Sequence, residues 1–183
     1  MFIVIPGWFI TFCTFPGIVS HEIGHRLFCD LAGVPVYKIR YFIFFSKTAG
    51  CVIHRRTSRL KHVFFITMGP FILNSVLSFL FFLPFAGFMH TQIYYGFRFS
   101  LIAYLVLGWI ASTMAFNAFP SNQDLKNLKE VLPEYANRRK HFYTIWICYL
   151  IFRLCSALEP LTGFLYALFM LLISSGFMWL VLF

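Results

Sequence analysis

The sequence contains few charged residues. Only 11% of its 183 residues are Asp, Glu, Lys or Arg, whereas 60% are hydrophobic and 21% are aromatic. These proportions lie outside the usual range of soluble domains, and the apolar residues form long blocks instead of the narrow stripe of a surface helix. The scarcity of charge argues against an ordinary soluble fold and predicts that lipid surrounds most of the chain.

Acidic residues are scarcer than basic ones, with 6 against 15 and a formal net charge of +9. In a soluble domain this excess would suggest nucleic-acid binding. Here the basic residues cluster in polar stretches between apolar blocks, where they set membrane topology and contact anionic headgroups. We therefore expect the lipid bilayer as a partner, and no nucleic acid.

The five cysteines are scattered, form no CxxC pair and lie mostly inside apolar blocks, so we expect free thiols. A cleaved signal is also not indicated, because no basic residue precedes the apolar stretch 2–15. This first stretch is expected to remain part of the fold.

The apolar blocks predict an all-α polytopic membrane protein with one membrane domain, residues 1–183. Five blocks are near the length that crosses a bilayer: 2–32, 63–89, 98–119, 142–158 and 161–182. The first carries Pro6 and Pro16, so we expect a kinked helix, or a short lead followed by a helix from about Ile18 to Leu31. Residues 1–126 would form a three-helix catalytic core, and 127–183 a cytoplasmic short helix and two further membrane helices.

Two polar stretches interrupt the blocks. Residues 36–53 are rich in β-branched and aromatic residues around Thr48-Ala49-Gly50, which predicts a small β-hairpin at the membrane interface. Residues 121–140 contain a short helix that begins near Asn122 and ends at Pro133. Between residues 26 and 61 there are eight basic residues and one acid. This loop should be cytoplasmic, which places the N-terminus outside.

The most specific motif is His21-Glu22-Ile23-Gly24-His25. Two histidines four residues apart lie about 40° apart around a helix and can point toward one ion. The HExxH pattern is typical of zinc peptidases, in which zinc lowers the pKa of a water and the glutamate acts as general base and then acid. The alternative is a hydrogen-bonded His/Glu cluster that only holds helices together, which is costly inside an apolar segment.

A catalytic zinc ion needs a third protein ligand and an open position. Asp124 is the best candidate, because it follows the third block at the cytoplasmic end. The sequence from Ser121 to Asp124 also fits a helix-capping box, so Asp124 could be only a capping residue. Four other histidines are weaker candidates: His54, His62 and His141 lie among basic residues, and His90 is predicted on the opposite side. Glu130 and Glu134 remain as glutamate alternatives.

These residues resemble the site-2 protease family of intramembrane zinc metalloproteases. The resemblance covers roughly residues 15–126 and rests on four features in the family's order: HEIGH at 21–25, Gly-Val-Pro-Val at 33–36, Gly69-Pro70 with Asn74, and Asn117-Ala118-Phe119-Pro120 followed by Asp124. It implies that His21, His25 and Asp124 bind one Zn²⁺ per chain, and that Glu22 is the general base and acid. It further implies that Asn117 or Asn74 holds the substrate strand or the developing oxyanion.

The expected function is hydrolysis of a peptide bond in or near a transmembrane segment of another membrane protein, at the cytoplasmic border of the bilayer. Two alternatives stay open. One is a noncatalytic, zincin-like protein that binds transmembrane helices. The other is a membrane metal transporter or sensor, which would need ligands on several spans.

Overall fold

The computed structural model is mostly helical and describes residues 7–44, 49–95, 101–135 and 139–182. The elements follow one another as α1 (Gly7–Cys13), α2 (Phe15–Leu31), β1 (Val36–Arg40), β2 (Cys51–His54), α3 (Leu60–Tyr95), α4 (Leu101–Phe116), α5 (Asn122–Val131), a 3₁₀ turn (Leu132–Tyr135), α6 (Arg139–Ala157) and α7 (Leu161–Leu182). Each of the five expected apolar blocks is thus mostly helical where it is described, and 36–53 contains the expected two strands.

The first block is a short lead followed by a helix. The chain turns at Thr14, between α1 and α2, and Pro16 lies in the first turn of α2, where a missing N–H does no harm. Helix α2 ends at Leu31, and Gly33 then adopts a φ of +64°, a conformation that favours glycine. Helix α2 starts three residues before the expected Ile18.

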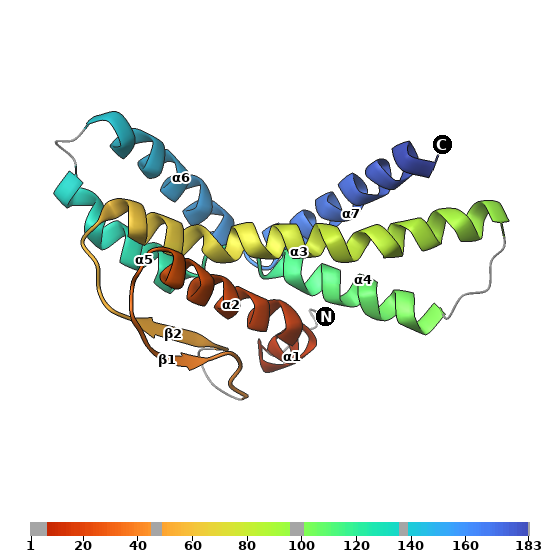
Figure 1. Cartoon of the computed structure of the whole chain (residues 1–183), viewed down its shortest axis with the longest axis horizontal. Coiled ribbons are helices and arrows are strands. Elements are labelled where there is room, and N and C mark those ends of the chain that lie inside the picture. Colours follow the sequence, from red (N-terminus) through yellow and green to blue (C-terminus); the bar gives the residue numbers. More distant parts are fainter. Residues whose placement is uncertain (1–6, 45–48, 96–100, 136–138, 183) are drawn as a thin grey trace, which may run out of the picture.

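Helix α3 runs along the whole molecule, and the other helices pack on its two parts (Figure 1). Its 36 residues correspond to about 54 Å at 1.5 Å per residue, well beyond the roughly 30 Å of a bilayer's hydrocarbon. We call residues 60–74 of α3 with α2, the hairpin, α5 and α6 the site half. Residues 75–95 of α3 with α4 and α7 form the apolar half.

The site half has a core of its own between α3, α5 and α6. Helix α5 starts with a capping box at Ser121 and buries Leu125, Leu128 and Val131 on one face. These residues pack with Val63 of α3 and Ile145 of α6. Burial of a side chain such as Leu128, which is fully enclosed, contributes about 1.5–3 kcal/mol.

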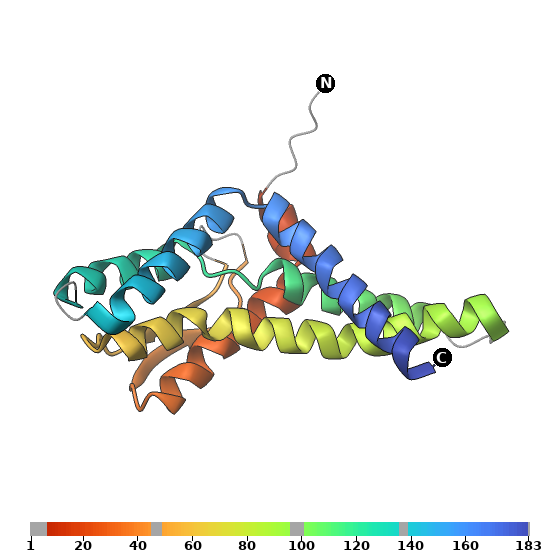
Figure 2. The ribbon, with the colours of Figure 1, turned by 90° about the horizontal axis from the view of Figure 1, so that it is seen from above.

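The apolar half is held together by Phe82 of α3, Ala111 and Ala115 of α4, and Met170 of α7. Since α6 packs on the first part of α3 and α7 on the second, α6 and α7 follow one another along the molecule (Figures 1 and 2). The three residues between them therefore form a bend, and α6 and α7 do not lie side by side.

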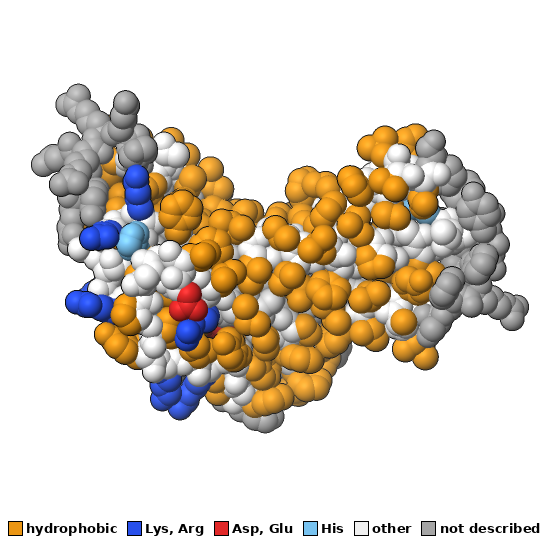
Figure 3. All heavy atoms as spheres, viewed as in Figure 1, with side chains coloured by type: hydrophobic (Ala, Val, Ile, Leu, Met, Phe, Trp, Pro, Cys, Tyr) orange, Lys and Arg blue, Asp and Glu red, His pale blue; other side chains and the backbone are white. Residues whose placement is uncertain are grey.

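Two helices in the described residues are long and apolar enough to cross a membrane, Leu60–Thr91 and Leu161–Leu182. Helix α4 and the apolar part of α6, Phe142–Ala157, are shorter. In Figure 3, hydrophobic side chains cover the visible face of the apolar half, and Lys and Arg gather over the site half. Five crossings and their sidedness stay predictions.

The hairpin is a two-stranded antiparallel sheet in which Ile39 of β1 pairs with Val52 of β2. The segment that joins the strands packs on the first helices through aromatic contacts of Phe42 with Phe15 and of Phe44 with Phe12. Thr48 of the expected turn lies outside the described residues, whereas Gly50 lies within them. These contacts hold β2 close to α2.

Candidate metal centre

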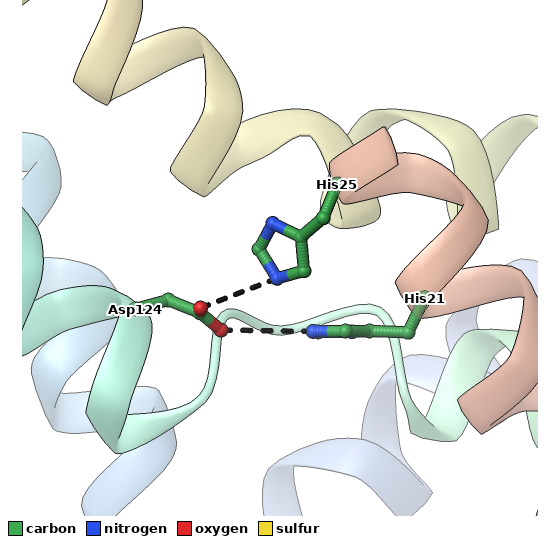
Figure 4. A group of neighbouring side chains, drawn as sticks. All are labelled: His21, His25 and Asp124. Carbon is green, nitrogen blue, oxygen red and sulfur yellow. Dashed lines mark ion pairs between the residues drawn. The ribbon is translucent and has the colours of Figure 1, made fainter. Parts of the chain in front are cut away.

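Helix α2 and the start of α5 bring three expected ligands together (Figure 4). The Nε2 atom of His25 lies 3.2 Å from Oδ1 of Asp124, and Nε2 of His21 lies 3.6 Å from Oδ2. Ligand atoms about 2.0–2.2 Å from a tetrahedral zinc ion lie about 3.4 Å from one another. All three ligand atoms lie within 4.8 Å of one another, so this group could hold a metal ion.

Both imidazole rings are oriented by backbone carbonyls. Nδ1 of His21 lies 2.8 Å from the carbonyl oxygen of Asn117, and Nδ1 of His25 lies 2.9 Å from that of Ile66. Because a carbonyl can only accept, each Nδ1 carries a hydrogen and donates it, so Nε2 of each ring is the atom that faces Asp124 and that can bind a metal ion once it is unprotonated. Metal-binding histidines are typically held in this way.

The carbonyl that orients His25 is free because of Pro70. In a helix, the carbonyl of residue 66 would accept from the N–H of residue 70, but proline has no N–H. The carbonyl of Ile66 is therefore available to His25. The neighbouring Gly69 allows α3 to pack closely on α2, because a Cβ at this position would lie 2.7 Å from the ring of Phe28.

Asn117 supplies the other carbonyl just beyond α4, where the last carbonyls of a helix lack partners in the helix. Its oxygen accepts from His21 at 2.8 Å and from Nδ2 of Asn74 at 2.9 Å. The same Nδ2 atom donates to the carbonyl of Gly17 at 3.2 Å. Asn74 thus links α2, α3 and the end of α4, and we call the meeting point of Gly17, Asn74 and Asn117 the junction.

The two asparagines for which a substrate or oxyanion role was expected lie at different depths. Asn74 is fully buried and does not line the cavity. Asn117 does line it, but its Nδ2 donates to the carbonyls of Thr113 at 2.9 Å and Thr14 at 3.4 Å. Both asparagines thus help to position His21, and the substrate or oxyanion role expected for one of them stays a prediction.

Asp124 faces the histidines and caps α5 at the same time. Its Oδ2 accepts from the backbone N–H and the hydroxyl of Ser121 at 2.9 and 2.6 Å, which leaves Oδ1 toward His25. Burial by itself raises the pKa of the Asp124 carboxyl, but His25 and His21 together hold this pKa well below its usual range. The carboxylate is therefore ionised at neutral pH, as a metal ligand must be.

Glu22 lies on the same cavity with an unused acceptor. The residue is 7% exposed, and its Oε2 is buried without a hydrogen-bond partner in the described structure. A buried carboxylate oxygen without a partner is costly, and it is suited to accept from a water beside a metal ion. Gly50 covers this side chain, because a Cβ at that position would lie 2.7 Å from Cγ of Glu22.

The cavity has a volume of about 560 Å³. Strand β2 forms one wall through Cys51, Val52 and His54, whereas β1 contributes no lining residue. No other described strand pairs with β2, so its second edge is unpaired in the sheet. His54 was expected to be a solvated loop residue, and only the path of the hairpin shows that it faces the cavity.

The remaining candidates lie elsewhere. His90 contacts Ser175 in the apolar half, Glu130 pairs with Arg56, and His62 does not line the cavity. The side chains of His141 and Glu134 lie outside the described residues. Glu159, from the bend between α6 and α7, also lines the cavity, and no motif in the sequence pointed to it.

Comparisons of the chain with protein-family models, with curated proteins and with solved structures gave no match. The geometry alone thus defines the class of site, a histidine and carboxylate group that could hold a metal ion.

Proposed function

We propose that this protein is an intramembrane zinc metalloprotease that hydrolyses a peptide bond in or near a transmembrane segment of a membrane protein. One observation carries the proposal. Both histidines of the HExxH motif donate Nδ1–H to backbone carbonyls and turn Nε2 toward Asp124, with Glu22 on the same cavity. A group that only held helices together would not need both Nε2 atoms to converge on one carboxylate.

His21, His25 and Asp124 would hold one Zn²⁺, which when bound supplies a Lewis acid that lowers the pKa of a water. Glu22 would take a proton from that water and later deliver it to the leaving amine. The carbonyls of Asn117 and Ile66 keep the two rings in place during these steps. Gly50 limits the open space around the Glu22 carboxylate.

The dimensions of the two halves support a site at the bilayer border. Residues 75–95 of α3 and the 22 residues of α7 correspond to about 32 Å each, close to one hydrocarbon thickness. Only 11% of the most apolar stretch of α7 is buried, so lipid is the natural surrounding for this helix. We place the apolar half in the membrane and the metal group at its cytoplasmic border, the side on which the basic residues lie.

The substrate would approach as an extended strand along β2. A transmembrane helix hides its peptide bonds, so it must unwind locally before hydrolysis. The free edge of β2 offers hydrogen-bonding groups to the unwound backbone, and Val52 faces the cavity next to the metal group.

The transporter alternative has little support in the described helices. A translocation path needs ligands along several spans. In the apolar half, the described histidine is His90, and it is bound to Ser175. Cleavage of a transmembrane segment is the measurement that distinguishes the protease from a noncatalytic protein that binds transmembrane helices.

The test compares zinc content with cleavage of a model transmembrane substrate in purified, detergent-solubilised protein. Wild type should hold one zinc and cleave. Glu22→Gln should hold one zinc and lose cleavage by roughly 10²- to 10⁴-fold, because only proton transfer is removed. Asp124→Ala should lose stoichiometric zinc.

Asp30→Ala is the matched control, because Asp30 is a carboxylate on α2 that pairs with Arg26 away from the cavity. It should retain both zinc and cleavage. Zinc without cleavage of any tested transmembrane substrate would favour the noncatalytic alternative, and wild type without zinc under metal-replete conditions would overturn the site.

A further inference from the structure

The charges that line the cavity have the opposite sign to the rest of the chain. The chain has 15 basic and 6 acidic residues. Three of the acids, Glu22, Asp124 and Glu159, line the cavity, and its described lining contains no Lys or Arg. In so basic a chain, this distribution favours a cationic group inside the cavity.

Two of these carboxylates have assigned roles, and the third has none. Asp124 faces the histidines, and Glu22 is the proposed base. Glu159 lies more than thirty residues further along the chain and is not part of the histidine group that could hold a metal. Its position at the cavity wall is therefore free for another use.

Glu159 has no cationic partner among the described residues. Arg153, the nearest basic residue in the sequence, donates instead to the hydroxyl of Tyr149 at 2.8 Å. Loss of water around Glu159 raises the pKa of its carboxyl, and the nearby His21 lowers it by a smaller amount. Glu159 is exposed and lines the cavity, so a cation from outside the chain can reach its unpaired carboxylate.

We propose that Glu159 is a specificity residue that selects a substrate with a Lys or Arg side chain close to the scissile bond. This inference rests on the proposed function and names its substrate class. Membrane proteins carry an excess of Lys and Arg just cytoplasmic of their transmembrane segments. A site at that border meets such side chains next to the segment it unwinds, and Glu159 offers them the unpaired carboxylate.

The test uses two substrates with the same transmembrane segment that differ by a single Lys→Gln change beside the cleavage site. Affinity is measured first in the Glu22→Gln background, where bound substrate is not consumed, and kcat and KM are measured with active enzyme. The Lys substrate should bind roughly five- to tenfold more tightly, and the difference should fall with added salt.

Glu159→Gln should abolish this preference through KM, and Glu159→Lys should reverse it, with zinc content unchanged in both variants. Asp30→Asn removes an acid outside the cavity and should leave the preference intact. Equal binding of the two substrates, or a preference that survives Glu159→Gln, would overturn the inference. A fall in zinc content in Glu159→Gln would overturn it too, because Glu159 would then be a metal ligand.

Failure of the proposed function gives a different result. If wild type cleaves neither substrate while the Lys preference in binding still depends on Glu159, the protease proposal fails and the recognition of a basic side chain stands.

Discussion

The apolar half and the site half of the molecule differ in the interactions that determine their structure. In the apolar half, α4, α7 and residues 75–95 of α3 carry no Lys, Arg, Asp or Glu in their described residues, and much of their surface is apolar and exposed. In the site half, particular carbonyls, close helix contacts and ion pairs fix a few side chains. The apolar half could thus keep its structure with many other apolar side chains in the same pattern. The geometry of the site half depends on particular hydrogen bonds and close contacts.

Glycines in both halves pack closely, but the closest approach is in the site half. A Cβ on Gly17, at the junction, would lie 1.9 Å from the carbonyl oxygen of Thr113. A Cβ on Gly24, between the two histidines, would lie 2.7 Å from Cα of Pro70. A Cβ on Gly176 in α7 would meet no atom within 4 Å. Matched substitutions in the two halves should therefore differ in their effects on zinc content and on the free energy of unfolding. Three pairs of variants test this difference.

The largest difference is expected for Gly17→Ala against Gly176→Ala. The added methyl group of Gly17→Ala must push α2 away from α4, which should cost about 1–3 kcal/mol or more and release zinc. Gly176→Ala should change the free energy of unfolding by less than about 1 kcal/mol and keep zinc. Thermal unfolding in detergent and measurement of zinc content check the two variants. Similar losses of stability and zinc in both would contradict a closely packed junction.

Pro70→Ala against Pro84→Ala should give an intermediate effect. Both prolines lie inside α3. In Pro70→Ala the restored N–H competes with His25 for the carbonyl of Ile66, so zinc affinity should fall by about 10- to 100-fold.

Pro84→Ala also restores an N–H, but it does so in the apolar half and should leave zinc affinity unchanged. Competition with a chromophoric chelator measures both affinities, while unfolding shows whether α3 itself has been weakened. Equal zinc affinity in the two variants would mean that the freed carbonyl does not orient His25.

The smallest effect is expected for Asn74→Ala against Ser78→Ala, one turn apart on α3 and both fully buried. Asn74 acts on zinc only through the carbonyl of Asn117, so its loss should weaken zinc binding by about tenfold. Ser78 donates to Ala111 in the apolar half, and its loss should cost about 0.6 kcal/mol without an effect on zinc. Competition with a chromophoric chelator and thermal unfolding measure the two effects. A loss of zinc in Ser78→Ala would show that the two halves are coupled.

Much of the local structure followed from the sequence. The short lead before α2, the end of α2 before Gly33, the hairpin within 36–53 and the start of α5 at Asn122 were all predicted. These features depend on neighbouring residues, through proline, glycine and capping chemistry.

Helix α3 was predicted as 63–89 and is longer, Leu60–Tyr95. Its two prolines do not end it, and at Pro70 the freed carbonyl has a partner in His25. The order of α6 and α7 along α3 could not be predicted either. A connection of three residues fits a bend as well as a reversal, and the choice depends on which part of α3 each helix contacts.

Part of the candidate site was likewise predictable from the sequence, and part was not. The sequence alone determined that His21 and His25 share one face of a helix with Glu22 beside them, because the helical repeat fixes that arrangement. Only the tertiary structure decided that Asp124 faces the histidines while it caps α5, and that Asn74 binds the carbonyl that orients His21. It also placed Glu159 on the cavity. These contacts join residues far apart in the sequence, and their geometry depends on how closely α2, α3 and α4 pack.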